Sequence, residues 1–166
     1  MANVAEWFRA VDHDGDGQIT AQELQAALRR GNLNFSLATV ARMIRAYDTN
    51  QNGMIDSTEF LGLHEFLMTM QKSFSYFDRN REGQLTFEQV MQAIMHAGIQ
   101  LDETAFYSMA RAFDPDRDGK LGLPEFIALS LFLKSAKAAF QAFDPHQAGN
   151  ITLNFNQFIF ACSHVA

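Results

Sequence analysis

Two segments of the chain, residues 12–23 and 114–125, carry acidic side chains at the same positions. Aspartates stand at the first, third and fifth positions, a glycine at the sixth and a glutamate at the twelfth. Ca²⁺ takes about six to eight oxygen ligands, and a loop of this kind supplies them from these carboxylates, the backbone carbonyl of the seventh position and a water or side chain at the ninth. The pattern therefore predicts two calcium sites. The expected ligands are Asp12, Asp14, Asp16, the carbonyl of Gln18 and Glu23 in the first segment, and Asp114, Asp116, Asp118, the carbonyl of Lys120 and Glu125 in the other.

The segment 48–59 repeats the pattern with weaker ligands. Its first and last positions are acidic, but neutral amides replace the aspartates at the third and fifth. An amide oxygen attracts Ca²⁺ less strongly than a carboxylate, so we expect a third site of lower affinity and two to three ions per chain. Its ligands would be Asp48, Asn50, Asn52, the carbonyl of Met54 and Glu59.

Two further copies of the pattern lack the last ligand. In residues 78–89 the twelfth position is Gln89, whose amide offers one oxygen where a bidentate carboxylate is needed. We expect this copy to be empty at resting calcium, with weak filling at high calcium left open. In residues 144–155 the twelfth position is Phe155, and the third and fifth positions also lack an oxygen ligand. That copy is expected to be structural.

The spacing of the copies predicts the elements that carry them. They begin at residues 12, 48, 78, 114 and 144, so steps of 36 and 30 residues alternate. The longer step leaves room for two helices and a connector, whereas the shorter step fits one continuous helix. Ser57–Phe77 and Glu125–Phe143 are each expected to form such a helix, shared between copies two and three and between copies four and five. The predicted fold is all-α, apart from short strand pairing around the eighth residue of each loop. Those residues are Ile19, Ile55, Leu85, Leu121 and Ile151.

A helix–loop–helix unit with such a loop is an EF-hand, and we number the units hand one to hand five. Five hands at this spacing, the last without its final ligand, resemble the penta-EF-hand family over residues 1–166, read as a single domain. The resemblance implies that the fifth loop is lengthened by two residues. It also implies that hand five pairs with hand five of a second subunit, giving a homodimer or heterodimer through the segment around Phe155, Phe158 and Phe160. The odd number of hands independently predicts an exposed apolar surface there.

The composition restricts the class of protein. With 13 basic against 19 acidic residues the net charge is −6, which argues against a nucleic-acid binder, because such a protein needs a basic surface. The single cysteine, Cys162, cannot form an internal disulfide, and the N-terminus has no signal-peptide pattern, so a cytoplasmic protein is expected. The apolar stretch Leu123–Phe143 is interrupted by Glu125, Lys134 and Lys137, and we interpret it as too polar to span a bilayer.

These observations favour a calcium sensor that exposes a hydrophobic surface for a target protein or peptide, with any membrane association indirect. The eight methionines fit this function, because methionine-lined surfaces adapt to varied partners, although core packing explains them as well. A calcium buffer and a regulatory subunit of a calpain-like protease are the alternatives. An enzyme is not expected, because Cys162 lies among apolar residues and the histidines show no zinc-type spacing.

Overall fold

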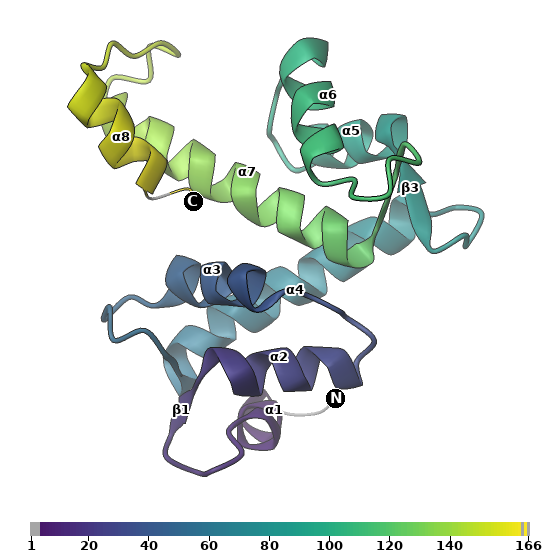
Figure 1. Cartoon of the computed structure of the whole chain (residues 1–166), viewed down its shortest axis with the longest axis vertical. Coiled ribbons are helices and arrows are strands. Elements are labelled where there is room, and N and C mark those ends of the chain that lie inside the picture. The colour runs from purple at the N-terminus through teal and green to yellow at the C-terminus, as the bar shows by residue number, and fades with distance from the viewer. Residues whose placement is uncertain (1–3, 164, 166) are drawn as a thin grey trace.

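The computed structural model of the chain describes residues 4–163 and 165 and consists of successive helix–loop–helix units (Figure 1). The predicted all-α fold with short strands in the loops is confirmed. The helices are α1 Val4–Val11, α2 Ala21–Arg30, α3 Leu37–Tyr47, α4 Ser57–Phe77, α5 Phe87–His96, α6 Glu103–Ala112, α7 Leu123–Phe143 and α8 Phe155–Ser163. The strands are β1 Gln18–Ile19, β2 Ile55–Asp56, β3 Gln84–Thr86 and β4 Lys120–Gly122.

The short strands join the loops of neighbouring hands in pairs. β1 and β2 are antiparallel with Ile19 opposite Ile55, and β3 and β4 are antiparallel with Leu85 opposite Leu121. All four of these side chains are fully buried. The prediction of pairing at the eighth residue is therefore confirmed for hands one to four. Ile151 of hand five lies in no strand, because the described part of the chain offers no sixth hand to pair with it.

Two long helices tie the hands together. α4 and α7 are each continuous over 21 residues, as the 30-residue steps predict, and Figure 1 shows α7 crossing α4 between the two pairs of hands. α7 contributes to both apolar cores. Ile127 and Leu131 pack into the core of hands one and two, whereas Phe126, Leu129 and Leu133 pack into the core of hands three and four. A displacement of α7 would therefore alter the packing of both cores.

The starts of the helices explain how the loops close. Three exit helices begin directly after a ninth-position residue whose side chain accepts a hydrogen bond from the backbone of the twelfth residue. The twelfth residue in turn reaches back to the backbone N–H of the ninth, which completes a capping box. The pairs are Thr20 with Glu23, Asp56 with Glu59, and Thr86 with Gln89. The same geometry that starts the helix therefore turns the last ligand of the loop inward.

The apolarity of α7 has a structural explanation. By length, and by a mean hydropathy of 1.3 over its most apolar 18 residues, this helix meets the criterion for a membrane span despite its three charged residues. Glu125, Lys134 and Lys137 therefore do not by themselves distinguish α7 from a membrane-spanning helix. Five apolar residues of α7 are buried in the two cores described above, and 28% of that 18-residue window is buried.

Helix α8 stands apart from the paired hands. It lies beside the C-terminal end of α7 (Figure 1), and none of its residues is buried. Its recorded aromatic contact with α7 is edge-on, between Phe160 and Phe143 with ring centroids 6.5 Å apart. The predicted exposure of the fifth hand is thus present in the described chain.

Candidate calcium sites

All five loops share one backbone scaffold. The first aspartate of each loop accepts a hydrogen bond from the N–H of the glycine at the sixth position, at 2.7–3.1 Å. These glycines have φ between 75° and 85°, a left-handed conformation that a side chain would strain. Because the scaffold is present even in hand five, it does not distinguish a metal site from a structural hand. The side chains at the third, fifth and twelfth positions must do so.

Hand one brings its predicted acidic ligands together. Carboxylate oxygens of Asp12, Asp14 and Asp16 lie within 4.8 Å of one another. The backbone holds them in place, since Asp14 accepts from the N–H of Asp16 at 3.2 Å and Asp16 accepts from the N–H of Gln18 at 2.8 Å. Three converging carboxylates repel one another unless a cation lies between them, so the donor set fits a hard divalent ion.

Glu23 closes hand one through hydrogen bonds to the loop. Its Oε2 accepts from the N–H and the hydroxyl of Thr20, at 2.9 and 2.7 Å, and its Oε1 accepts from the N–H of His13 at 3.0 Å. These bonds, that from the Thr20 N–H first, lower the pKa of the Glu23 carboxyl below its ordinary value. Glu23 is thereby kept ionised, which is the state that binds Ca²⁺.

Hand two has the same closure with fewer charges. Asp48 accepts from the N–H of Gly53 at 2.7 Å, and Glu59 Oε1 accepts from the N–H of Thr49 at 2.8 Å and of Asn50 at 3.2 Å. Glu59 is only 7% exposed. Burial raises the pKa of the Glu59 carboxyl, but hydrogen bonds from the N–H of Asp56 and from Thr49 outweigh burial. The pKa of Glu59 is therefore lowered below its ordinary value.

The amide ligands of hand two are oriented by their neighbours. The side-chain oxygen of Asn50 accepts from the N–H of Asn52 at 3.1 Å, and the side-chain oxygen of Asn52 accepts from the N–H of Met54 at 2.8 Å. The Asn52 amide nitrogen donates to Gln18 Oε1 in hand one at 2.9 Å, which fixes which end of the amide is the acceptor. Hand two therefore presents neutral oxygens where hand one presents carboxylates.

Hand four contains a buried carboxylate oxygen without a donor. Asp114 is 5% exposed, and its Oδ1 has no hydrogen-bond partner within the described residues. Oxygens of Asp114, Asp116 and Asp118 lie within 4.8 Å of one another, and the neighbouring Asp114 carboxyl raises the pKa of Asp116 above its ordinary value. A buried carboxylate oxygen without a hydrogen-bond donor is costly, and so are closely spaced carboxylates. A cation bound between them would satisfy the oxygen and offset the repulsion.

The ninth position of hand four makes room for its last ligand. Gly122 offers no cap, and Glu125 Oε2 lies 2.7 Å from the point that a Cβ on Gly122 would occupy. Any side chain there would displace the carboxylate. No hydrogen bond to the Glu125 carboxylate is recorded in the described part of the chain, so it differs from Glu23 and Glu59 in being unengaged. The residues present at hand four fit a Ca²⁺ ion.

Hand three is closed by groups that need no metal. Gln89 Nε2 donates to the carbonyl of Phe77 at 3.0 Å, while its Oε1 accepts from the N–H of Thr86 at 2.8 Å. Glu82, at the fifth position, pairs with Lys120 of hand four at 3.3 Å. The ammonium of Lys120 thus neutralises a carboxylate that would otherwise face the ion, in keeping with the prediction of an empty hand.

Hand five caps its exit helix two residues late. Gln157 Oε1 accepts from the N–H of Asn154 at 2.9 Å, and Asn154 Oδ1 accepts from the N–H of Gln157 at 3.0 Å. This reciprocal pair occupies the places of the ninth and twelfth residues in the other hands. The loop is therefore longer by two residues, as the resemblance implied. Gln157 rather than Phe155 fills the closing position, and Phe155 is left on the surface.

Sequence reasoning missed the contacts that link one loop to another. The side chain of Lys120, assigned only a carbonyl role, reaches Glu82, and Gln84 Nε2 lies 3.5 Å from Asp118 Oδ2. The two pairs are 38 and 34 positions apart, respectively, so no local pattern reveals these contacts. The closing pair Asn154–Gln157 did have a signal, since its spacing is that of a capping box.

Comparisons with known proteins agree with this geometry. The model for an EF-hand domain pair matches residues 2–63 and 67–131. The chain is 30% identical to peflin of Danio rerio over 156 residues, covering 93% of this chain and 58% of peflin, so it spans little more than half the length of that relative. It is 29% identical to penta-EF hand domain-containing protein 2 of Dictyostelium discoideum, covering 95% of this chain and 76% of that protein.

A solved structure extends the agreement to three dimensions. The structure of a homolog of programmed cell death 6 protein from Leishmania major Friedlin superposes with a TM-score of 0.77 at 36% sequence identity. It covers 99% of this chain and 94% of the solved chain. Together with the five loops and the unpaired fifth hand, this likeness identifies the chain as a member of the penta-EF-hand family of EF-hand calcium-binding proteins.

Proposed function

We propose that the chain is a calcium-responsive adaptor that binds Ca²⁺ at hands one, two and four and then engages a partner protein. The observation that carries this proposal is the unpaired fifth hand. It retains the loop scaffold but presents apolar side chains to solvent instead of pairing within the chain. Such a surface has a function only when something covers it. The exposed residues of α8 are Phe155 (74%), Phe158 (53%), Ile159 (50%) and Phe160 (58%).

The first partner is a second penta-EF-hand chain. Ile151 lies beside α8 with its backbone outside any strand, so it is available to pair with the equivalent strand of another fifth hand. Pairing would bury the four aromatic and aliphatic side chains of α8 as the paired loops bury Ile19 and Ile55. A homodimer or a heterodimer satisfies this equally, and solution mass distinguishes them.

The second partner is a target segment in a groove between α4 and α7. This groove has a cavity volume of about 700 Å³, with a floor that includes Phe66, Met70, Ile94, Phe126 and Leu133. Both walls are exit helices of calcium hands, α4 from hand two and α7 from hand four. Movement of either helix on calcium binding would change the width of the groove, which supports a sensor over a buffer.

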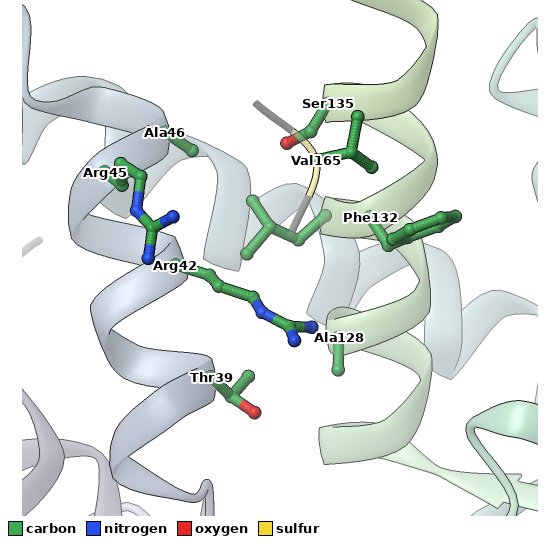
Figure 2. Close-up of a pocket in the computed structure, with 9 residues that line it drawn as sticks. Thr39, Arg42, Arg45, Ala46, Ala128, Phe132, Ser135 and Val165 are labelled. Atoms are coloured by element: carbon green, nitrogen blue, oxygen red, sulfur yellow. The ribbon is translucent and has the colours of Figure 1, made fainter. Parts of the chain in front are cut away.

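A catalytic function has no support from the small cavity between α3 and α7. The small cavity between α3 and α7 in Figure 2 has a volume of about 50 Å³, enough for a few waters. Its polar lining consists of two arginines and two hydroxyls, without the carboxylate, histidine or thiol that acid–base or nucleophilic catalysis requires. We propose a non-enzymatic, cytoplasmic protein, with any membrane association indirect.

The proposal is tested by titrating the chain with Ca²⁺ while following the fluorescence of a hydrophobic dye and the mass in solution. We expect two to three ions per chain, a rise in dye fluorescence on calcium addition and a mass of at least two chains. Full calcium binding without a fluorescence change would favour the buffer. A dimer that exchanges a subunit for a protease large chain would favour the calpain-like alternative.

A further inference from the structure

The groove between α4 and α7 carries positive charge as well as apolar side chains. Lys134 and Lys137 both line it, three residues apart and so on one face of α7. Glu65, on α4, is the carboxylate among the lining residues. The groove thus has an excess positive charge on a chain whose net charge is −6.

Lys134 is held in place by aromatic rings. Its Nζ lies 4.2 Å from the centroid of the Tyr47 ring and 5.4 Å from that of Phe66, and it donates a hydrogen bond to Tyr47 Oη. An ammonium has three N–H donors, of which the phenol takes one. A cation held over aromatic rings loses little additional conformational freedom when it binds an anion.

Lys137 also makes a hydrogen bond at the groove. Its Nζ donates to the carbonyl of Gly98, after the end of α5, at 3.1 Å. Within residues 4–163 and 165, neither Lys134 nor Lys137 has a carboxylate oxygen within ion-pair distance. Two ammonium groups, each with N–H donors left over, therefore line a groove that also carries apolar side chains.

We infer that the groove recognises an apolar segment of a partner protein that also carries aspartate or glutamate, whose carboxylates pair with Lys134 and Lys137. This inference rests on the proposed function, because it names the class of segment that the adaptor binds. Apolar side chains of the segment cover Met70, Ile94 and Leu133, and the acidic residues fix its position along the groove. Charge pairs of this kind discriminate between partners more than they add to affinity.

Tyr47, which contacts Lys134, also adjoins a calcium hand. Tyr47 directly precedes Asp48, the first ligand of hand two, and its ring packs on α4 at Gly62, where an added Cβ would lie 3.1 Å from Tyr47 Cδ1. The residue that leads into the hand-two loop therefore also positions Lys134. A movement of Tyr47 when calcium binds at hand two would therefore also move Lys134.

The test is a selection of a random twelve-residue peptide display library on the purified full chain, with Ca²⁺ and with EGTA. The variants are Lys134→Met with Lys137→Met, which keeps the side-chain stems while removing both charges, and Lys72→Met, which removes a lysine of α4 outside the groove. Unchanged calcium stoichiometry and helical circular dichroism show that each variant is folded.

We expect the unaltered chain and Lys72→Met to enrich peptides that combine aspartate or glutamate with apolar residues, in Ca²⁺ only. The double variant should lose the acidic enrichment. One enriched peptide, compared by calorimetry with its Asn/Gln counterpart, should bind the unaltered chain about tenfold more tightly and the double variant within about twofold.

Acidic enrichment that persists in the double variant overturns the inference, and so does calcium-dependent selection of apolar peptides without acidic residues. In the latter case the proposed function stands. If calcium changes the selection in no way, both the inference and the proposed sensor function are wrong.

Discussion

The side-chain amide of Gln89 donates a hydrogen bond from Nε2 to the carbonyl oxygen of Phe77 at 3.0 Å. Phe77 is the last residue of α4, and the final carbonyls of a helix have no partner within it. A glutamate cannot make this bond, because a carboxylate has no N–H to donate. Gln89 stands where a calcium-binding hand has its last glutamate, and its amide also links the end of α4 to the start of α5.

Replacing Gln89 by glutamate should remove the hydrogen bond to Phe77 and create a calcium site in hand three. We expect Gln89→Glu to add one Ca²⁺ to the stoichiometry, since Asp78 and the loop scaffold are already in place. Without calcium the variant should be less stable by about 1 kcal/mol, because the carbonyl of Phe77 loses its donor. Calorimetric titration and thermal unfolding in EGTA measure the two effects.

Gln89→Ala is the matched control, since it also removes the bond to Phe77 but offers no oxygen to an ion. It should lower stability without raising the ion count. An unchanged count in Gln89→Glu would contradict the prediction. It would mean that the ion pair between Glu82 and Lys120 excludes the metal from hand three.

The parts of the fold that the sequence predicted are those set by short-range patterns. The ligand spacing, the long helices α4 and α7, and the pairing of Ile19 with Ile55 all follow from loop positions and intervals. The bond between Lys134 and Tyr47 joins residues 87 positions apart. No local pattern carries it, because it depends on how α7 crosses α4. The unengaged Glu125 was likewise hidden, since only the structure shows it beside the bare Cα of Gly122.

The last ligands of hands two and four should differ in what they contribute without metal. Glu59 accepts four hydrogen bonds from loop donors and is buried, whereas none is recorded to the Glu125 carboxylate. Glu59→Gln places an amide nitrogen against donors and should lower the stability of the calcium-free chain by about 1–3 kcal/mol. Glu125→Gln should leave that stability nearly unchanged. Urea unfolding in EGTA compares them.

In calcium both variants should lose one ion, as should Glu23→Gln, because each removes the bidentate carboxylate of its loop. The unaltered chain and Gln157→Glu are the controls. The latter restores a carboxylate in hand five, where the third and fifth positions still lack oxygen ligands, so no ion is gained. A full ion count in both Glu23→Gln and Glu125→Gln would show that the site assignments are wrong.

Protons should compete with calcium at hand four before they do so at hand one. The neighbouring Asp114 carboxyl raises the pKa of Asp116 above 3.8, whereas hydrogen bonds led by the Thr20 N–H lower the pKa of Glu23 below 4.5. A raised pKa means that Asp116 holds its proton at higher pH, so calcium must displace it. As pH falls from 7, calcium affinity should therefore decline first at hand four. Titrations of Glu23→Gln/Glu59→Gln and Glu59→Gln/Glu125→Gln isolate hands four and one.

The stability contributed by Glu23 and that contributed by Asp116 depend on pH in opposite directions. Glu23 has a lowered folded pKa, so its hydrogen bonds stabilise the fold above pH 4.5, and this contribution disappears as pH falls through the folded pKa. Asp116 has a raised folded pKa, so its contribution is present below 3.8 and disappears as pH rises through the raised value. Equal pH midpoints for calcium loss at the two hands would contradict the assignment.

The exposed face of α8 should set the oligomeric state. Phe158 is 53% exposed, with no recorded ring contact in the described chain, so a charge there disturbs little within one subunit. At an interface it would place an unpaired carboxylate against apolar side chains, which is strongly unfavourable. We expect Phe158→Glu to convert the dimer to a monomer in sedimentation experiments, with calcium stoichiometry unchanged.

A second substitution separates the interface from the packing of α8 on α7. Phe160 contacts Phe143 edge-on within the chain, so Phe160→Glu should lower both dimerisation and stability, whereas Phe158→Glu should lower dimerisation alone. Tyr76 is 66% exposed on α4, and Tyr76→Glu is the control for an added surface charge outside α8. It should leave the dimer intact. A dimer that survives Phe158→Glu would place the contact elsewhere than the fifth hand, and an unaltered chain that sediments as a monomer would rule out the homodimer.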